Sequence, residues 1–593
     1  MKRRFRILWR GAHVLNVLAF LAFFAFVVAS NDFDWDHFLT GAEVDRRAWV
    51  IDHEPPVWSY QLCGGVTRAG DPQAFGLSPL FLWVVPQGSF WGLKTAWLAL
   101  AVLGFVSLRR ILSIFLLGGV ARELRKSERL ALDWVSLAFV LGNYFLWHAH
   151  EGHLTIALGF LGLAIIEKLF SAFAHGFRWR SAVAATLMTW AYVSGGFYHS
   201  LVFFIAPLSL ALILGVGWSL VAQRARRLPP VGNWSALAKL ATACVLGIGI
   251  GFYKVYAVAS YQALLPRTTT HAVNGVDGAG PLQTLVYQLV PSLDGAFLGG
   301  FRGWPPWGIW ETSAFNLNAW GLLIAAGLTL IWRARGQSLA AERRSSNGGP
   351  LRHSLVVVTA IVGAVGLWFS LGELAPISGF EVLNRLTHNS VRVAGRFQIL
   401  FGLAAAMGLA LLLGRSRRLA HQFAKYGAWT APVLLVLNLT SFLSTLRPES
   451  ARSILSAPKD PIAHMNTLRV GRERSEDHSY MYRSILRGIA MLNCYDPIAR
   501  ETRLVREFVG RPEFMNGSGH LQDGTVLPLI DPQVGSPPES CRAGSYFTQN
   551  RIVMDASCPV GTCVNANGLN LWGDSRLVLN TELNKYCLGS SSR

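Results

Sequence analysis

Long apolar segments recur along most of the chain and alternate with short polar stretches. Each is about 17 to 25 residues long, which is the length that a helix needs to cross the hydrocarbon core of a bilayer. The segments lie at 8–30, 88–107, 130–147, 154–172, 181–197, 200–222, 236–258, 316–333, 354–371, 397–414 and 428–445. The pattern predicts a polytopic α-helical membrane domain over 1–445, with about eleven transmembrane helices.

The first apolar segment follows a basic flank that includes Lys2, Arg3 and Arg4, which is also typical of a signal peptide. The segment is longer than the apolar region of a signal peptide, and no clear small-x-small cleavage site follows it. We therefore interpret it as a retained first span.

Lys and Arg are concentrated in alternate connections between the spans. Cytoplasmic loops carry such an excess, so we expect the N-terminus to be cytoplasmic. An odd number of spans then places the chain after residue 445 on the outer side. The predicted outer segments are 31–87, 148–153, 195–199, 259–315 and 372–396.

The region 446–593 is more polar than the rest and has turn residues between short β-like runs. This pattern predicts a small extracytoplasmic domain with an α/β or mainly β fold. Cysteines are frequent here: Cys494, Cys541, Cys558, Cys563 and Cys587. Such a density predicts disulfides on an oxidising face of the membrane, and the spacing leaves their connectivity open.

Composition and charge agree with a membrane protein. The chain has 593 residues, of which 52% are hydrophobic and 15% charged, whereas a soluble chain carries about 25% charged residues. A net charge of +20 is typical of nucleic-acid binding in a soluble protein. Here the basic residues lie in the predicted cytoplasmic loops, so we expect membrane lipids as partners and no nucleic acid.

Three carboxylates, Asp32, Asp34 and Asp36, directly follow the first span. Carboxylates at this spacing can ligate a hard divalent cation, hold a phosphate through it, or act as a general base. A solvated helix terminus is the alternative interpretation. The position at a membrane exit favours function, because ionisable groups there are costly to bury without a partner.

A histidine-rich turn lies between the third and fourth predicted spans and contains His148, His150, Glu151 and His153. Imidazoles can donate hydrogen bonds to phosphate oxygens or bind a transition metal, although the spacing is not that of a strong zinc motif. The alternative is a chance cluster at the membrane interface.

Two further outer segments carry candidate sugar-binding groups. Tyr198 and His199 follow two glycines, whose alternative role is helix packing. Glu311 follows a stretch with several tryptophans, which also suits the aromatic belt of a membrane protein.

Arg392 and Arg396 precede the tenth predicted span on the outer side, against the usual charge bias. They are four residues apart and share one face if the helix has begun. The guanidinium fork suits a phosphate or pyrophosphate, while contact with lipid headgroups is the alternative.

With these motifs in this order, the chain resembles the GT-C superfamily of polytopic glycosyltransferases, especially the bacterial YfhO-like membrane proteins. The resemblance covers residues 1–445. It rests on the acidic motif after the first span, Pro56-x-Trp58, Cys63-Gly64-Gly65, Ser78-Pro79, His150-x2-His153, Gly195-Gly196 and Arg392-x3-Arg396-Phe397.

A more distant resemblance is to the catalytic subunit of oligosaccharyltransferase. Asp32-Phe33-Asp34 looks like the first acidic motif of that subunit, and Gly195-Gly196-Phe197 looks like its Gly-Gly-aromatic turn. Histidines stand where that enzyme has its second outer acidic motif, so metal dependence is left open.

The resemblance implies an inverting transfer of a sugar from a polyprenyl-phosphate or polyprenyl-diphosphate donor to a glycan, lipid or protein acceptor. It also implies a multi-pass protein of the bacterial inner membrane with a periplasmic tail. A transporter or binding protein for a lipid-linked saccharide is the alternative function.

We assign expected roles to the candidate residues on this basis. Asp34 is the expected base, with Asp32 and Asp36 in support. Donor phosphate binding is expected from Arg392, Arg396, His150 and His153. Substrate binding is expected from His148, Glu151, Tyr198, His199 and Glu311. A divalent cation, Mg²⁺ or Mn²⁺, if required, is expected at Asp34, His150 and His153.

Overall fold

The structure is a computed structural model of the chain. It describes residues 2–30, 33–62, 65–118, 123–196, 200–225, 233–264, 352–372, 375, 377–386, 394–414, 419–425, 465, 467–469, 485, 490–491, 526–532, 534–548, 550–566, 577–580 and 585–589. The predicted spans 316–333 and 428–445, and the boundary between the two predicted domains, lie outside these residues.

The described part of the chain is mostly helical, as the hydropathy pattern predicts. Four of its helices are long and apolar enough to cross a membrane. These are α4 (Ser89–Leu117), α7 (Leu154–His175), α11 (Trp234–Leu264) and α15 (Arg352–Ser370). The total of about eleven spans stays a prediction.

Other predicted spans are also helical, with shorter apolar stretches or fewer residues. They are α1 (Lys2–Ala29), α8 (Trp179–Ser194), α10 (Ala206–Ala225) and α17 (Gln398–Leu413). A π-helical turn, η3 (Leu201–Ile205), precedes α10.

One predicted span is interrupted. Instead of a continuous helix over 130–147, α5 (Lys126–Val140) and α6 (Asn143–Glu151) meet at a bend of 46°. Gly142 lies at the bend with an extended backbone and precedes the first residue of α6. If the bent pair is one span, it is the fifth candidate among the described residues.

Close helix packing at glycines holds the bundle together. α4 packs against α7, and a Cβ at Gly104 would lie 2.2 Å from the ring of Phe160. α15 packs against α17, where a Cβ at Gly366 would lie 2.8 Å from the side chain of Leu400. Small residues at such contacts let helix backbones approach closely, which is how helices associate in membranes.

An outer layer follows α1. It begins with α2 (Phe33–Arg47) and a π-helical turn, η1 (Ala48–Asp52), and continues with the two-residue antiparallel strands β1 (Trp58–Ser59) and β2 (Val66–Thr67). It ends with a 3₁₀ turn, η2 (Pro79–Trp83), and the short helix α3 (Val84–Gln87). Ser78 caps η2 by accepting a hydrogen bond from the backbone N–H of Leu80.

The C-terminal part contains small sheets, in agreement with the sequence-based prediction. One has the order β4 (Ala490–Met491), β3 (Thr467–Arg469), β5 (Val526–Pro528), and another the order β8 (Cys563–Val564), β10 (Lys585–Leu588), β9 (Leu577–Asn580). A two-stranded sheet joins β6 (Tyr546–Phe547) to β7 (Ile552–Val553), after a short helix, α22 (Glu539–Gly544).

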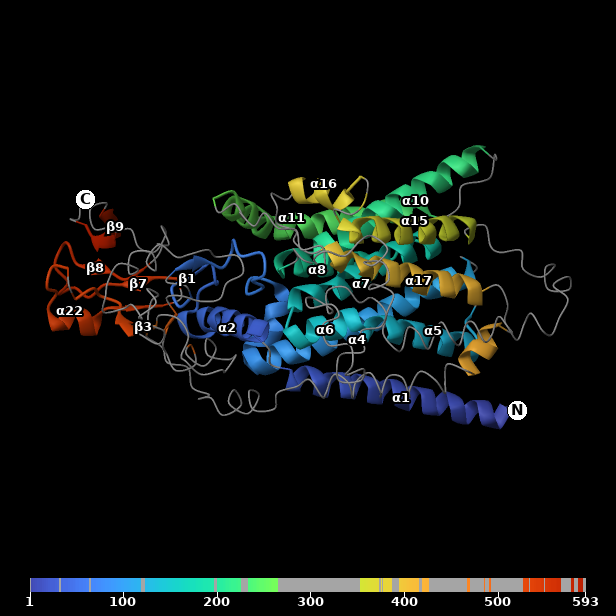
Figure 1. Cartoon of the computed structure of the whole chain (residues 1–593), viewed down its shortest axis with the longest axis horizontal. Helices are drawn as coiled ribbons and strands as arrows, with labels where there is room; N and C mark the ends of the chain where they lie inside the picture. Colours follow the sequence, from blue (N-terminus) through green and yellow to red (C-terminus); the bar gives the residue numbers. More distant parts are fainter. Residues whose placement is uncertain are drawn as a thin grey trace.

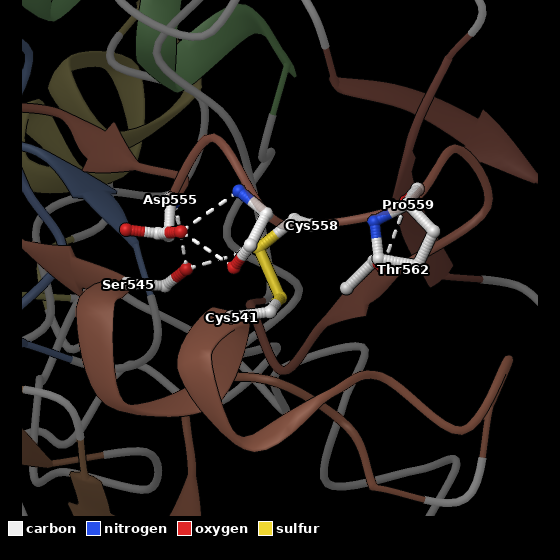
Figure 2. The surroundings of a disulfide bond; sticks show 7 residues. Cys541, Ser545, Asp555, Cys558, Pro559 and Thr562 are labelled. Atoms are coloured by element: carbon white, nitrogen blue, oxygen red, sulfur yellow. Dashed lines mark hydrogen bonds between the residues drawn. A yellow bond between two sulfur atoms is a disulfide. The ribbon is translucent and has the colours of Figure 1, made fainter.

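Among the described residues of the tail, two disulfides link separate segments. Cys541 in α22 is bonded to Cys558, and Cys563 is bonded to Cys587, its direct partner in the β8–β10 pairing. Beside the first bond, the hydroxyl of Ser545 accepts a hydrogen bond from the N–H of Asp555 at 2.9 Å (Figure 2). The prediction of a disulfide-bearing tail is confirmed for these four cysteines.

The tail and the outer layer share a hydrophobic core. Tyr60, between β1 and β2, is buried in the same cluster as Leu527 and Ile552 of the tail. Asn550 accepts a hydrogen bond from the N–H of Trp58 at 3.0 Å, and Arg551 forms an ion pair with Glu54. The outer layer is therefore attached to the tail as well as to the helices.

The start of α1 and the C-terminal end of the chain lie at opposite ends of the long axis (Figure 1). The tail, with its disulfides, is thus at the end toward which α1 runs. Apolar helices together with disulfides are typical of a membrane protein with an extracytoplasmic region.

Peptide mapping of the non-reduced, full-length protein should recover Cys541 linked to Cys558 and Cys563 linked to Cys587. Replacing Cys563 and Cys587 by serine should lower the unfolding free energy of the tail by about 2–4 kcal/mol, because the unfolded chain gains freedom. Limited proteolysis measures the change. Cys244→Ser is the control, since the Cys244 thiol is free; other pairings, or unchanged protease resistance, would contradict the prediction.

Candidate functional site

The candidate site begins where α1 ends and α2 starts. Ser30 closes α1, donating from both its backbone N–H and its hydroxyl to the carbonyl of Phe26. Asp32 lies outside the described residues. Asp34 is in the first turn of α2, where only its backbone is described, and Asp36 is fully buried one half-turn later.

The start of α2 packs against the end of α6. The indole N–H of Trp35 donates to the carbonyl of Ala149 at 3.0 Å, and the Phe38 ring lies edge-on to the His153 ring. At the end of α6, Gly152 has φ +88°, and a Cβ there would lie 2.8 Å from the Trp35 ring. Only glycine combines this backbone with so close an approach.

The sequence analysis places the histidines on a turn between two spans. In the structure they lie in the last turn of α6 and in the residues directly after it. His148 and His153 are joined by a hydrogen bond between their Nδ1 atoms at 2.8 Å, so one ring donates and the other accepts. His148 lies 4.6 Å from the ring of Tyr144, and His150 stacks on Phe26 of α1. The histidines therefore face the corner between α1 and α2.

The predicted arginine pair is described only in part. Arg396 belongs to the 3₁₀ turn η5 (Ala394–Phe397), anchored by Phe397, which packs on Phe369 of α15 and Phe380 of α16 (Gly379–Leu386). Arg392 lies outside the described residues.

The side chains of the remaining predicted substrate-binding residues lie outside the part of the chain that the structure describes. Tyr198, His199 and Glu311 are not described, and of Glu151 only the backbone is. Among the described side chains, no group of three His, Cys, Asp or Glu residues could hold a metal ion. The structure thus brings the start of α2 next to the histidines, and every assigned role stays a prediction.

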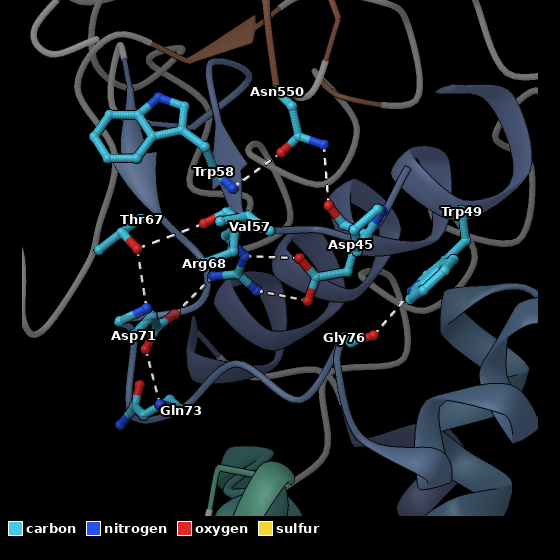
Figure 3. Close-up of polar contacts among 12 residues, drawn as sticks. Asp45, Trp49, Val57, Trp58, Thr67, Arg68, Asp71, Gln73, Gly76 and Asn550 are labelled. Atoms are coloured by element: carbon cyan, nitrogen blue, oxygen red, sulfur yellow. Dashed lines mark hydrogen bonds and ion pairs between the residues drawn. The ribbon is translucent and has the colours of Figure 1, made fainter. Parts of the chain in front are cut away.

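A buried charge cluster lies near the C-terminal end of α2, and the sequence analysis did not identify it. Arg68 makes a bidentate ion pair with Asp45 of α2 at 2.8 and 3.0 Å, and a second ion pair with Asp71 at 2.6 Å (Figure 3). Lys254 of α11 donates to the backbone carbonyls of Arg68 and Asp71 at 3.1 and 2.6 Å. All four side chains are buried.

The electrostatics of Asp45 are set by competing effects. Burial raises the pKa of its carboxyl group, and the adjacent Arg68 guanidinium opposes this rise. Asp71 raises the same pKa further, while Lys254 lowers it. The cluster is therefore a balanced arrangement of two carboxylates and two cations, which is the condition for burying charge.

Two glycines make room for the cluster. A Cβ at Gly41 would lie 2.8 Å from the Arg68 guanidinium, and one at Gly76 would lie 2.5 Å from the Asp45 carboxylate. Gly76 also accepts a hydrogen bond from the indole of Trp49 at 2.9 Å. The outer layer is thus packed directly onto the charged side chains.

The outer layer is also bonded to two of the helices that are long and apolar enough to cross a membrane. Glu43 of α2 accepts from Ser89 at the start of α4 at 2.8 Å and forms an ion pair with Arg46. Tyr253 of α11 donates to the carbonyl of Leu77 at 2.8 Å. The outer layer is therefore hydrogen-bonded to both α4 and α11.

One more charged group lies at this corner and was missed from sequence. Lys94 of α4 is fully buried and donates to the carbonyl of Ser30. A single lysine inside an apolar segment is the signal that could have identified it, because ionisable residues in membrane spans are functional candidates.

No protein-family model matches this sequence, and no curated protein or solved structure is significantly similar to it.

Replacing Arg68 by methionine should lower the unfolding free energy by about 3–5 kcal/mol at neutral pH, because Asp45 loses its bidentate cation while it stays buried. The loss should shrink as the pH falls. Without Arg68, the pKa of Asp45 rises further above its unfolded value. A group with a raised folded pKa contributes stability at low pH and loses it as the pH rises through that pKa.

Thermal unfolding of the detergent-solubilised protein over a range of pH measures this effect. The double variant Asp45→Asn, Arg68→Met is the control, and its loss of stability should depend less on pH. A loss that is equal at all pH values in Arg68→Met would show that Asp45 does not respond to Arg68.

Replacing Gly152 by alanine should weaken the contact between α2 and α6, because the new Cβ clashes with the Trp35 ring. Gly561→Ala is the control: Gly561 has φ +90° with nothing within 4 Å of an added Cβ. Both variants place an alanine at a positive φ. The clash with Trp35 should lower the unfolding free energy of Gly152→Ala by about 1–3 kcal/mol more than that of the control. Equal thermal shifts for the two variants would argue against a close α2–α6 contact.

Proposed function

We propose that this chain is an integral membrane glycosyltransferase of the GT-C type. It transfers a sugar from a polyprenyl-phosphate or polyprenyl-diphosphate donor to an acceptor at the outer face of the membrane, with Asp34 as the base. This function combines the resemblance in motif order with the arrangement of residues at the α1–α2 corner.

The contact between the start of α2 and the end of α6 is the observation that carries the proposal. It joins an acidic helix start to the His148–His153 pair, although the two segments are more than a hundred residues apart, as the Trp35–Ala149 hydrogen bond shows by its separation of 114. Sugar transfer from a phosphate needs a base for the acceptor and hydrogen-bond donors for the leaving group, and these two segments carry residue types suited to both roles.

The proposed chemistry is an inverting substitution. The acceptor oxygen attacks the anomeric carbon, and its proton passes to the Asp34 carboxylate. The bond between the anomeric carbon and the phosphate oxygen breaks, and the lipid phosphate leaves with the electron pair. Asp34 later releases the proton to water.

Charge that develops on the leaving phosphate needs hydrogen-bond donors. We assign this role to His150, His153, Arg392 and Arg396. Among them, His153 already shares a hydrogen bond with His148, so its ring orientation is held before a donor binds. No step of this scheme requires a metal ion, and a bound Mg²⁺ or Mn²⁺ would add charge stabilisation at the same phosphate.

We assign acceptor binding to the outer layer and the tail. They form one packed unit through Tyr60 and Asn550, and the outer-layer part of this unit directly follows the acidic segment in the chain.

Transport of a lipid-linked saccharide is the second candidate function. The bend of 46° between α5 and α6 supports it, because broken helices form substrate sites in many transporters. In this case the histidines at the end of α6 bind cargo and no glycosidic bond changes.

The reconstituted full-length protein should transfer sugar from a polyprenyl-phosphate donor, and Asp34→Asn should reduce turnover by at least about 100-fold. Its thermal stability should stay close to that of the wild type. Asp52→Asn, at another outer carboxylate, is the control and should keep its activity. Activity retained by Asp34→Asn rules out this base, and saccharide movement across the bilayer without transfer favours the transporter.

A further inference from the structure

Lys94 is a buried lysine whose ammonium group is stabilised by a backbone carbonyl and aromatic rings. Its side chain is 0% exposed, six residues into α4. Its ammonium group donates to the carbonyl of Ser30 at 2.5 Å and lies over the rings of Trp35 and Phe90. Among the described side chains, no carboxylate forms an ion pair with it.

The Trp35 ring is the main partner of this charge. The ammonium nitrogen lies 3.2 Å from the ring centroid, against 5.6 Å for Phe90. Tryptophan gives the strongest cation–π attraction, and the attraction grows when water is excluded. The Ser30 carbonyl adds to it, because the C-terminus of a helix favours a positive charge.

Trp35 makes contacts in two directions, through its ring face and through its indole N–H. Its face holds Lys94, and its indole N–H donates to Ala149, which lies between His148 and His150 in α6. Gly152 brings the backbone after α6 against the same ring. Lys94, Trp35 and Ala149 thus form a continuous connection from α4 through α2 to α6.

We propose that Lys94 is a positioning residue, which through Trp35 holds the His148–His153 pair against the acidic start of α2. Its role in turnover depends on the proposed function, whereas its effect on the histidines does not. Lys94 touches neither reacting group and acts only by fixing the tryptophan ring between two helices.

A neutral side chain of similar shape tests this role. Lys94→Met keeps most of the length and volume of the side chain and removes the charge, so the Trp35 ring loses its cation and Ser30 its donor. Trp35→Phe keeps a smaller aromatic face for Lys94 and removes the N–H that reaches Ala149. Lys254→Met is the matched control, since Lys254 is an equally buried lysine that bonds outer-layer carbonyls elsewhere.

The first readout is independent of any enzymatic activity. The full-length protein in nanodiscs is treated with diethyl pyrocarbonate, and carbethoxylation of His148 and His153 is followed by peptide mass spectrometry. Both histidines are buried, so they react only when the turn opens locally. We expect Lys94→Met to raise their rates about tenfold, since losing a buried cation–π contact is worth at least that factor.

We expect a smaller rise in Trp35→Phe and no rise in Lys254→Met. Unchanged histidine rates in both Lys94→Met and Trp35→Phe overturn the proposal. Equal rises in Lys94→Met and Lys254→Met also overturn it, because they indicate general loosening. Trp35→Phe is the milder change and decides the question if Lys94→Met does not accumulate as folded protein.

The second readout is turnover of the polyprenyl-phosphate sugar. A positioning role predicts that Lys94→Met lowers kcat and leaves the KM for the donor nearly unchanged, because Lys94 does not contact the donor. A raised KM with unchanged kcat argues for direct donor binding and overturns the positioning role. If the wild type shows no turnover, the glycosyltransferase proposal fails, while the histidine rates still decide the role of Lys94.

Discussion

The burial of charge at the outer end of the helices is the constraint on which the rest of this structure depends. Lys254 and Lys94 both carry an ammonium group into a fully enclosed position, and each is compensated in a different way. Lys254 bonds the carbonyls of a loop that already holds an Arg68–Asp45 ion pair, and Lys94 uses a carbonyl and the face of Trp35. Lys254 attaches the loop at Arg68 and Asp71 to α11, and Lys94 attaches the start of α2 to α4.

Hydropathy predicted the positions of the described long helices well, because apolar length is a local and additive property of the sequence. The bend at Gly142 could not be predicted in this way, since a glycine adds little to the hydropathy of an apolar run. The pairing of Arg68 with Asp45 was also out of reach. It depends on the path of an irregular loop over α2, and no periodicity records that path.

The candidate site shows the same division. The topology predicted from charge and hydropathy puts the acidic segment and the histidine-rich segment on one side of the membrane. In the structure, Trp35 and Phe38 of the first segment contact Ala149 and His153 of the second. Topology alone could not show that the histidines bond each other. Nor could it show that an aromatic ring between two acidic positions is the element that joins the helices.

The shared core of Tyr60 with the tail has a consequence for biosynthesis. Trp58 and its partner Asn550 are separated by 492 positions, so at about 5–20 residues per second the ribosome needs roughly 25–100 s to make one after the other. During this interval the outer layer is exposed without the residues that complete its core. Tyr60 and its neighbours are made early but are among the last to complete their packing, and a truncated nascent chain leaves the apolar side of this core uncovered.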